Sequence, residues 1–221
     1  MQPLAVIFDM DGLLFDTERL IREALFAASV EVGCEMTSAI HKQMVGCQWP
    51  IIASQLISHF GTQFDVESLR VEWARQFRSQ RNNLQMKPGV IELLQTLDEL
   101  GLPRAIATSS SHDDVYHNLS MHKLFGRFDK IVAQGDYAAS KPAPDAYLMA
   151  AQLLGVDPAD CMALEDSYNG VRSAAAAGMI TVMVPDLLEP SEEMRALCKY
   201  ITVDLLEVRK QLSDFANYAH E

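Results

Sequence analysis

The amino-acid sequence predicts an α/β fold: a doubly wound, Rossmann-like parallel sheet into which a small α-helical domain is inserted. Two observations carry this prediction. Short apolar runs rich in β-branched residues alternate with longer helical patterns over most of the chain. One segment, residues 17–83, interrupts this alternation, because it holds helical patterns and no convincing strand.

Five apolar runs are predicted to be strands. Continuous apolar runs of this length are typical of parallel strands whose two faces are both covered. The five runs are residues 4–8, 103–108, 130–133, 161–164 and 180–184.

Helices are predicted between the later strands, and each ends at a glycine. Glycine is favoured just after a helix because it adopts the left-handed conformation without strain. The predicted helices and their terminal glycines are residues 90–100 with Gly101, 145–154 with Gly155 and 170–177 with Gly178.

The helical segment follows the first predicted strand directly. Pro50 and Gly61 divide it into several helices, and Lys87-Pro88-Gly89 marks the return to the sheet. We therefore expect two domains, a core made of residues 1–16 and 84–221 and a helical domain made of residues 17–83.

The composition of the 221-residue chain is that of a globular protein, with 49% hydrophobic and 22% charged residues. Its formal net charge of −12 argues against a nucleic acid or an anionic membrane as the main partner, because both favour basic surfaces.

The four cysteines have no metal-ligand or CxxC spacing, so we expect reduced thiols. We see no signal peptide and no apolar run long enough to span a membrane, and expect a cytoplasmic monomer.

Two carboxylates, Asp9 and Asp11, directly follow the first predicted strand. Ligand sites of open α/β sheets lie beyond the carboxyl ends of the strands, so both side chains are candidates for one site. Gly12 permits a tight turn after them. Taken alone the motif is weak evidence, because Asp and Gly also form ordinary turns.

Hydroxyl groups and a lysine follow the next two strands. Thr108 and Ser109 come after the second strand, where hydroxyls and N–H groups suit an anion, although an N-cap explains them equally well. Lys141 stands in a loop stiffened by Pro142 and Pro144, and a lysine in a loop is usually only a solvated charge.

Adjacent acidic residues, Glu165 and Asp166, end the fourth predicted strand. Two neighbouring carboxylates at the end of a buried strand are costly without a cation, and Mg²⁺ would remove that cost. An exposed acidic turn that caps the next helix is the alternative. The order of the four signals is more informative than any one of them, because all four follow strands and should meet at one edge of the sheet.

This order of motifs resembles the haloacid dehalogenase superfamily over nearly the whole chain. The helical insertion is similar to the small helical cap of the branch that includes β-phosphoglucomutases, phosphoglycolate phosphatases and pseudouridine-5'-phosphatases. The motifs that carry the resemblance are the run from Asp9 to Glu18, Thr108-Ser109, Lys141 to Asp145, and Glu165 to Ser167 with Asn169-Gly170.

The resemblance implies a Mg²⁺-dependent phosphatase that forms a covalent aspartyl-phosphate on Asp9, with Asp11 as general acid and base. The implied metal ligands are the Asp9 carboxylate, the Asp11 carbonyl and Asp166, with Glu165 as a ligand or its neighbour. Many relatives have a further Asp at the position of Gly170, so here Glu165 is expected to supply the missing charge. Relatives that act as dehalogenases lack an Asp matching Asp11, which excludes that chemistry.

The resemblance also assigns the phosphate-binding groups. Thr108, the Ser109 N–H and Lys141 are expected to hold the phosphoryl oxygens. The implied substrate is a small phosphomonoester, and sugar phosphates, nucleoside monophosphates and polyol phosphates all fit.

A phosphosugar mutase of the β-phosphoglucomutase type is the alternative function. Those mutases place a His at the position of Ile21 and an Arg at that of Trp49 to grip a second phosphate, and neither residue is present here. Trp49 offers a flat apolar face suited to stacking on a base or sugar ring, or it packs between helices of the inserted domain. Unless Arg75 or a neighbouring residue replaces the grip on the second phosphate, we expect a phosphatase, with Trp49 as a substrate contact.

Overall fold

The computed structural model describes residues 2–45, 47 and 49–218, the last four of these by their backbone alone. The chain forms two compact units. The core unit comprises Met1–Asp16 and Met86–Glu221, and the helical unit comprises Thr17–Gln85. The second junction lies two residues beyond the boundary expected after residue 83.

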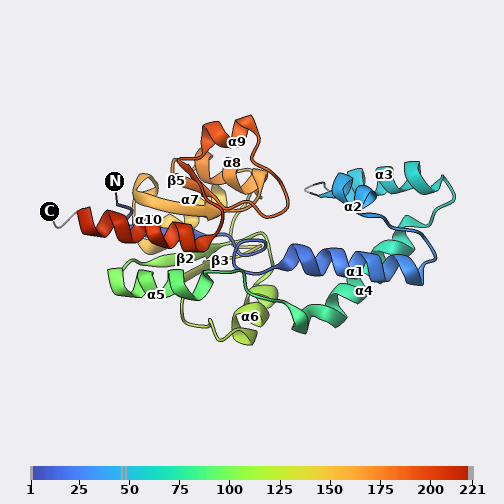
Figure 1. Cartoon of the computed structure of the whole chain (residues 1–221), viewed down its shortest axis with the longest axis horizontal. Coiled ribbons are helices and arrows are strands. Elements are labelled where there is room, and N and C mark those ends of the chain that lie inside the picture. Colours follow the sequence, from blue (N-terminus) through green and yellow to red (C-terminus); the bar gives the residue numbers. More distant parts are fainter. Residues whose placement is uncertain (1, 46, 48, 219–221) are drawn as a thin grey trace. The chain divides into compact units, whose positions relative to one another are not determined.

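The core unit is built on one six-stranded sheet in the order β3-β2-β1-β4-β5-β6, in which every neighbouring pair is parallel. Figure 1 labels β2, β3 and β5 of this sheet. The strands are β1 (Ala5–Phe8), β2 (Arg104–Ala107), β3 (Lys130–Val132), β4 (Cys161–Glu165), β5 (Ile180–Met183) and β6 (Tyr200–Ile201). The predicted α/β fold and all five predicted strands are confirmed. The sixth strand was not predicted, because two half-buried residues at a sheet edge leave no pattern in the sequence.

The sheet register aligns the ends of the central strands. Phe8 pairs with Ile106 on one side and with Leu164 on the other. The residues that follow these three strands therefore emerge at one edge. That edge is also the switch point of the sheet, because the chain runs outward from β1 in both directions.

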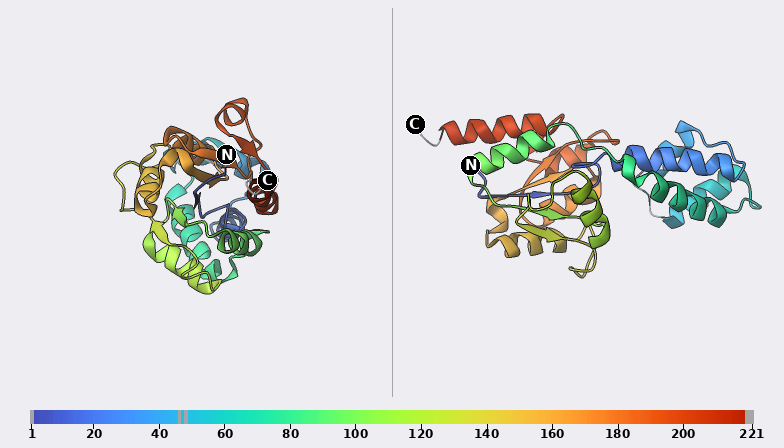
Figure 2. Two further views of the ribbon diagram at one scale, coloured as in Figure 1. Left: turned by 90° about the vertical axis from the view of Figure 1, so that its left-hand side faces the viewer. Right: turned by 90° about the horizontal axis from the view of Figure 1, so that it is seen from below.

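Helices cover both faces of the sheet. Figure 2 shows α5 and α10 together on one face and α7 on the other. The core helices are α5 (Val90–Leu100), α6 (His112–Met121), α7 (Asp145–Leu154), α8 (Tyr168–Ala176), α9 (Glu192–Leu197) and α10 (Leu205–Tyr218), with a short 3₁₀ turn η2 (Pro158–Asp160). Gly101 and Gly155 end α5 and α7 in the left-handed conformation, as the sequence predicts.

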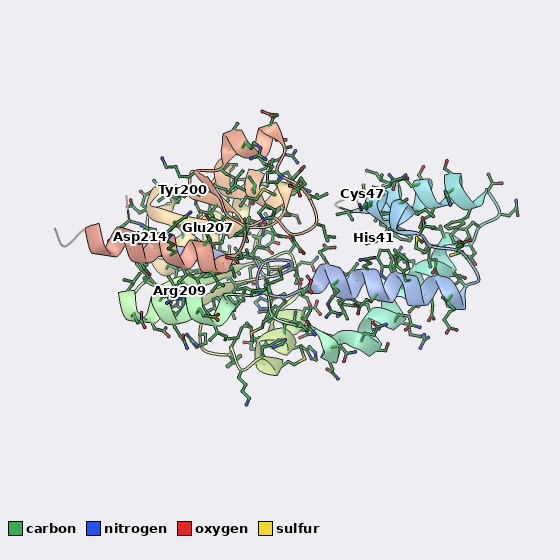
Figure 3. The ribbon with its side chains drawn as sticks, in the orientation of Figure 1. His41, Cys47, Tyr200, Glu207, Arg209 and Asp214 are labelled. Carbon is green, nitrogen blue, oxygen red and sulfur yellow. The ribbon has the colours of Figure 1, made fainter. Side chains whose placement is uncertain are left out.

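Small buried side chains bring α7 and α8 close to the sheet. Ala146, Ala150 and Ala151 of α7 pack with alanines of β1, β2 and β4 in one apolar cluster. On the opposite face α10 lies against α5, where Arg209, labelled in Figure 3, donates from Nε to Thr96 Oγ1 at 3.2 Å.

The helical unit has a core of its own. It contains α1 (Thr17–Glu31), α2 (Ser38–Met44), α3 (Trp49–Phe60), α4 (Val66–Gln80) and the 3₁₀ turn η1 (Arg81–Asn83). Leu25, Leu56 and Leu69 are fully buried at its centre. His41, labelled in Figure 3, is buried beside them with its ring 6.4 Å from that of Phe26. Among the described residues, no helix of either unit is long and apolar enough to cross a membrane.

Candidate active site

Three strand ends hold the candidate side chains at one edge of the sheet. The ladder continues past the strands, because the N–H of Asp9 donates to Leu164 O at 3.0 Å and the N–H of Thr108 donates to Val132 O at 3.0 Å. The N–H of Val184 donates to Glu165 O at 2.7 Å. Hydrogen bonds on the main chain therefore fix the backbone from which these side chains project.

Lys141 is the charged centre of the site. Its side chain is only 7% exposed, and its Nζ lies 2.5 Å from both Asp9 Oδ1 and Glu165 Oε1. The ammonium also lies 4.9 Å from the centre of the Tyr147 ring. Burial alone would lower the pKa of Lys141, but the carboxylates of Asp9 and Glu165 outweigh it and raise that pKa above its usual value. Lys141 is thus a permanent buried cation and not a solvated loop residue.

Glu165 is fully buried, and other residues occupy both of its oxygens. The Tyr147 hydroxyl donates to Oε1 at 2.8 Å, beside the ammonium of Lys141. The N–H and hydroxyl of Ser167 donate to Oε2 at 3.3 and 3.1 Å. These contacts fix Glu165 as the partner that holds Lys141 in place.

Gly170 makes the position of Glu165 possible. A Cβ atom at this glycine would lie 1.8 Å from both Oε1 and Cδ of Glu165. Any side chain at position 170 is therefore incompatible with the glutamate as it stands. Many relatives have an aspartate at the position of Gly170. Here the glutamate at 165 leaves no room for a side chain at that position.

Asp9, Glu165 and Asp166 form an acidic cluster whose oxygens lie within 4.8 Å of one another. Burial, opposed by Lys141 and reinforced by Glu165 and Asp11, raises the pKa of Asp9 to about 7. Burial, with the charges of Glu165 and Asp9, raises the pKa of Asp166 well above its usual value. The single ammonium does not compensate these charges, and a divalent cation bound to the oxygens would. Oxygen donors of this kind fit Mg²⁺ or Ca²⁺.

Gly12 lies directly against this cluster. Its φ is +83°, and a Cβ there would lie 2.2 Å from Asp166 Oδ2. Both the turn and the close approach of Asp166 therefore require a glycine.

Asp11 lies at the half-buried rim of the site. The hydroxyl of Ser110 donates to Asp11 Oδ2 at 2.6 Å. The Ser110 N–H in turn donates to Thr108 Oγ1 at 3.1 Å, and the Tyr137 hydroxyl donates to the Thr108 carbonyl at 3.0 Å. Ser109 is exposed at the same strand end. The loop after β2 thus orients Asp11 as well as offering groups to an anion.

The family model for haloacid dehalogenase-like hydrolases matches residues 6–184, which include β1 to β5 and the whole helical unit. The chain belongs to this family. A probable pseudouridine-5'-phosphatase of Drosophila melanogaster is 39% identical over 195 residues, which is 81% of this chain and 80% of that protein. Hexitol phosphatase B of Escherichia coli K12 is 34% identical over 192 residues, 83% of this chain and 84% of that protein. The resemblance deduced from the motifs is confirmed, and so is the predicted enzyme class, a haloacid dehalogenase-type phosphoric monoester hydrolase.

Solved structures of the family share the whole fold. The crystal structure of a putative β-phosphoglucomutase from Thermotoga maritima covers 97% of this chain and 99% of its own, with a TM-score of 0.82 and 27% identity. This match includes the helical insertion, so the expected combination of a Rossmann-like core and a helical domain is confirmed.

Several residues of this haloacid dehalogenase-like site were not found from the sequence. Tyr147 lies within the helix predicted for residues 145–154, and its hydroxyl donates to Glu165, a residue 18 positions away. Asp186 follows β5 at the same edge, and its charge helps to raise the pKa of Asp166. Its Oδ1 accepts from Lys87 Nζ at 2.7 Å. Asp186 could have been found from the sequence, because it is an acidic residue two positions after a predicted strand.

Trp49 belongs to the helical unit. Its indole N–H donates to Glu67 Oε1 at 3.3 Å, and the guanidinium of Arg70 lies 5.2 Å from its ring centre. The ring is half-buried at the start of α3, beside the apolar core of that unit. Ile21 lies in the same unit, on α1.

Proposed function

We propose that this haloacid dehalogenase-like hydrolase cleaves small phosphomonoesters with Mg²⁺, through an aspartyl-phosphate on Asp9. The observation that carries the proposal is the pairing of Asp9 with a buried ammonium at the switch point of the sheet. One oxygen of Asp9 lies 2.5 Å from Lys141, and the carboxylate also belongs to the acidic cluster with Asp166. A carboxylate held this way is a nucleophile whose position is fixed before the substrate arrives.

Asp9, Asp166 and the carbonyl of Asp11 are the groups that would hold the cation. Bound there, Mg²⁺ would neutralise charge on Asp9 and on the phosphoryl oxygens. The raised pKa values of Asp9 and Asp166 support this assignment, because a bound cation would offset the burial that favours their protonated forms.

The first step forms a bond from an Asp9 oxygen to phosphorus and breaks the bond to the ester oxygen, which takes a proton from Asp11. In the second step water attacks phosphorus, Asp11 accepts its proton, and the bond to Asp9 breaks to release phosphate. Ser110 supports this role, because its hydroxyl orients Asp11 Oδ2. Lys141, Thr108 and the Ser109 N–H would stabilise the phosphoryl oxygens in both steps.

A phosphatase is favoured over a mutase by the helical unit. A mutase must grip a second phosphate with cationic or hydrogen-bonding groups. Ile21 has no such group, and the indole N–H of Trp49 already bonds Glu67. We expect free phosphate as the product, and conversion of β-glucose 1-phosphate to glucose 6-phosphate without phosphate release would overturn this part of the proposal.

The relatives indicate two substrate classes. One carries the name of a nucleotide phosphatase and another that of a hexitol phosphatase. A nucleoside monophosphate and a polyol phosphate share the phosphomonoester and differ in the presence of a planar ring. Trp49 is proposed to contact this variable part.

Two variants test the mechanism. Asp9→Asn keeps the shape of the side chain but is a poor nucleophile, so we expect loss of turnover with an unchanged circular dichroism spectrum.

Asp11→Asn should accumulate the phosphoenzyme, because no base activates water, and mass spectrometry after rapid quenching should find one added phosphate on Asp9. Substantial turnover by Asp9→Asn, or full activity in chelator with no bound metal, would refute the proposal.

A further inference from the structure

Tyr147 is a fully buried phenol that contacts both members of the ion pair formed by Lys141 and Glu165. It lies in the first turn of α7, a few residues after Lys141 in the sequence. Its ring centre lies 4.9 Å from Lys141 Nζ, and its hydroxyl donates to Glu165 Oε1 at 2.8 Å. One rigid side chain therefore contacts the cation through its ring and the anion through its hydroxyl.

The hydroxyl of Tyr147 is not needed to fill the core. The side chain packs in an apolar cluster made largely of alanines from α7 and the sheet, where a phenylalanine has nearly the same shape. A buried hydroxyl is costly unless it has a hydrogen-bond partner. Burial and the charge of Glu165 raise the pKa of Tyr147 well above its usual value, so the hydroxyl keeps its proton and remains a donor. The hydrogen bond to Glu165 is therefore what distinguishes tyrosine from phenylalanine at this position.

This hydrogen bond helps to fix the orientation of the Glu165 carboxylate. Ser167 donates to Oε2 from its N–H and its hydroxyl, which restrains one oxygen. The other oxygen, Oε1, accepts from Tyr147 and from Lys141 Nζ. Lysine carries its charge on a flexible four-carbon stem, so it restrains the carboxylate less than a rigid phenol does.

The ring of Tyr147 restrains the ammonium of Lys141. An ammonium has three donors, and Lys141 Nζ lies 2.5 Å from both Asp9 Oδ1 and Glu165 Oε1. The ring lies within the distance at which a cation is attracted to an aromatic side chain. The two carboxylates and the ring together confine the charge to one position beside the Asp9 oxygen.

We propose that Tyr147 is a positioning residue of the active site, whose hydroxyl orients Glu165 and whose ring confines Lys141, so that the ammonium stays beside Asp9. It acts through Lys141 and not on the reacting atoms. A displaced ammonium should slow the chemical step more than it weakens binding, because the alignment of charge with the reacting bonds lowers the barrier. The effect on turnover rests on the proposed phosphatase function, whereas the restraint on Lys141 does not.

Tyr147→Phe removes the hydroxyl and keeps the ring. It should lower kcat for the best phosphomonoester by about tenfold, equivalent to about 1.4 kcal/mol, with KM changed by less than about twofold. Tyr116→Phe, the same change at an exposed tyrosine of α6, should change neither constant. A role in packing alone would lower Tm without this selective loss of kcat. An unchanged kcat in Tyr147→Phe with a native circular dichroism spectrum would overturn the proposal.

The ammonium of Lys141 provides a measurement that does not depend on turnover. Because it is buried between two carboxylates, its protons should exchange slowly with water. A proton–nitrogen correlation spectrum of the lysine side chains in the full chain should then show its signal, which is identified by its absence in Lys141→Arg. Tyr147→Phe should speed the exchange and broaden this signal, and Tyr147→Leu, which also removes the ring, should shift it. Tyr116→Phe should leave it unchanged.

A wild type without a slowly exchanging Lys141 signal, or the same signal in both Tyr147 variants, would overturn the proposal. The two measurements also separate it from the proposed function. A wild type that releases no phosphate from any phosphomonoester would refute the phosphatase, and the ammonium spectrum would still decide whether Tyr147 holds Lys141. A perturbed ammonium signal with an unchanged kcat would refute the positioning role and leave the phosphatase standing.

Discussion

At the scale of the residue, Asp9 shows the cost of burying a carboxylate at the carboxyl ends of the strands. Its side chain is 10% exposed, and burial is the main cause of its raised pKa. Below about pH 7 the protonated form of Asp9 is therefore favoured in the folded protein without bound metal. A carboxylate selected only for stability would not be placed there, which is why its energetic cost points to function.

The pH dependence of stability follows from this shift. The pKa of Asp9 is about 7 in the folded protein and ~4 in the unfolded chain, so between these values the folded state holds an extra proton. The contribution of Asp9 to stability is then fully present below pH ~4 and is lost as the pH rises through about 7.

We therefore expect the metal-free wild type to lose Tm relative to Asp9→Asn as the pH rises from 4 to 8, because asparagine does not ionise. Thermal denaturation in chelator measures the difference, and added Mg²⁺ should reduce it. A difference in Tm that does not vary with pH would contradict the raised pKa of Asp9.

At the scale of the element, neighbouring serines in the loop after β2 make different hydrogen bonds and have different roles. The hydroxyl of Ser110 donates to Asp11, whereas Ser111 is the N-cap of α6 and accepts from the N–H of Asp114 at 3.2 Å. The sequence run of hydroxyls at residues 108–111 predicted both a cap and an anion site, and the structure separates the cap from the group that orients Asp11.

These serines form a matched pair for mutagenesis. Ser111→Ala should lower the free energy of unfolding by about 1 kcal/mol through the lost cap and leave turnover nearly unchanged. Ser110→Ala should lower kcat by roughly tenfold or more, because Asp11 is no longer oriented, with little change in stability. Urea denaturation and steady-state kinetics distinguish the two effects, and identical profiles for both variants would refute the division of roles.

At the scale of the whole molecule, the two units are joined by chain segments that lie side by side. Phe15 pairs with Met86 in an antiparallel bridge, and the N–H of Lys87 donates to Leu14 O at 2.9 Å. Every described strand belongs to the core unit, and each unit has its own buried apolar cluster. We therefore expect the core unit to fold without the insertion.

Replacing residues 17–85 with a short Gly-Ser linker should yield a folded core that is stabilised by Mg²⁺. The adjacent chain ends make the closure cost small, because a short loop loses little entropy. Circular dichroism and thermal denaturation with and without Mg²⁺ test this expectation. An aggregated or unfolded product would show that the core depends on the helical unit.

Features that depend on residues close together in the sequence could be predicted, whereas features that depend on residues far apart in the sequence could not. Strands and helices left local patterns, and the four motifs after the strands were assigned to one edge because parallel strands align their carboxyl ends. The contacts of Tyr147 and Trp73 left no such pattern. Their roles depend on partners distant in sequence, such as Glu165 for Tyr147 and the Ile21 carbonyl for Trp73.

The glutamate at 165 excludes a side chain at position 170, and this restricts how the site can change in evolution. A Cβ at 170 and the glutamate carboxylate cannot occupy the same space, so the two residues can be exchanged only in a particular order. Gly170→Asp alone should lower Tm strongly, and the same substitution should be tolerated once Glu165→Ala has vacated the space. The effect of one mutation then depends on the other. Chains with a glutamate at 165 and chains with an aspartate at 170 would be separate adaptive solutions, and the path between them would pass through chains that carry neither side chain.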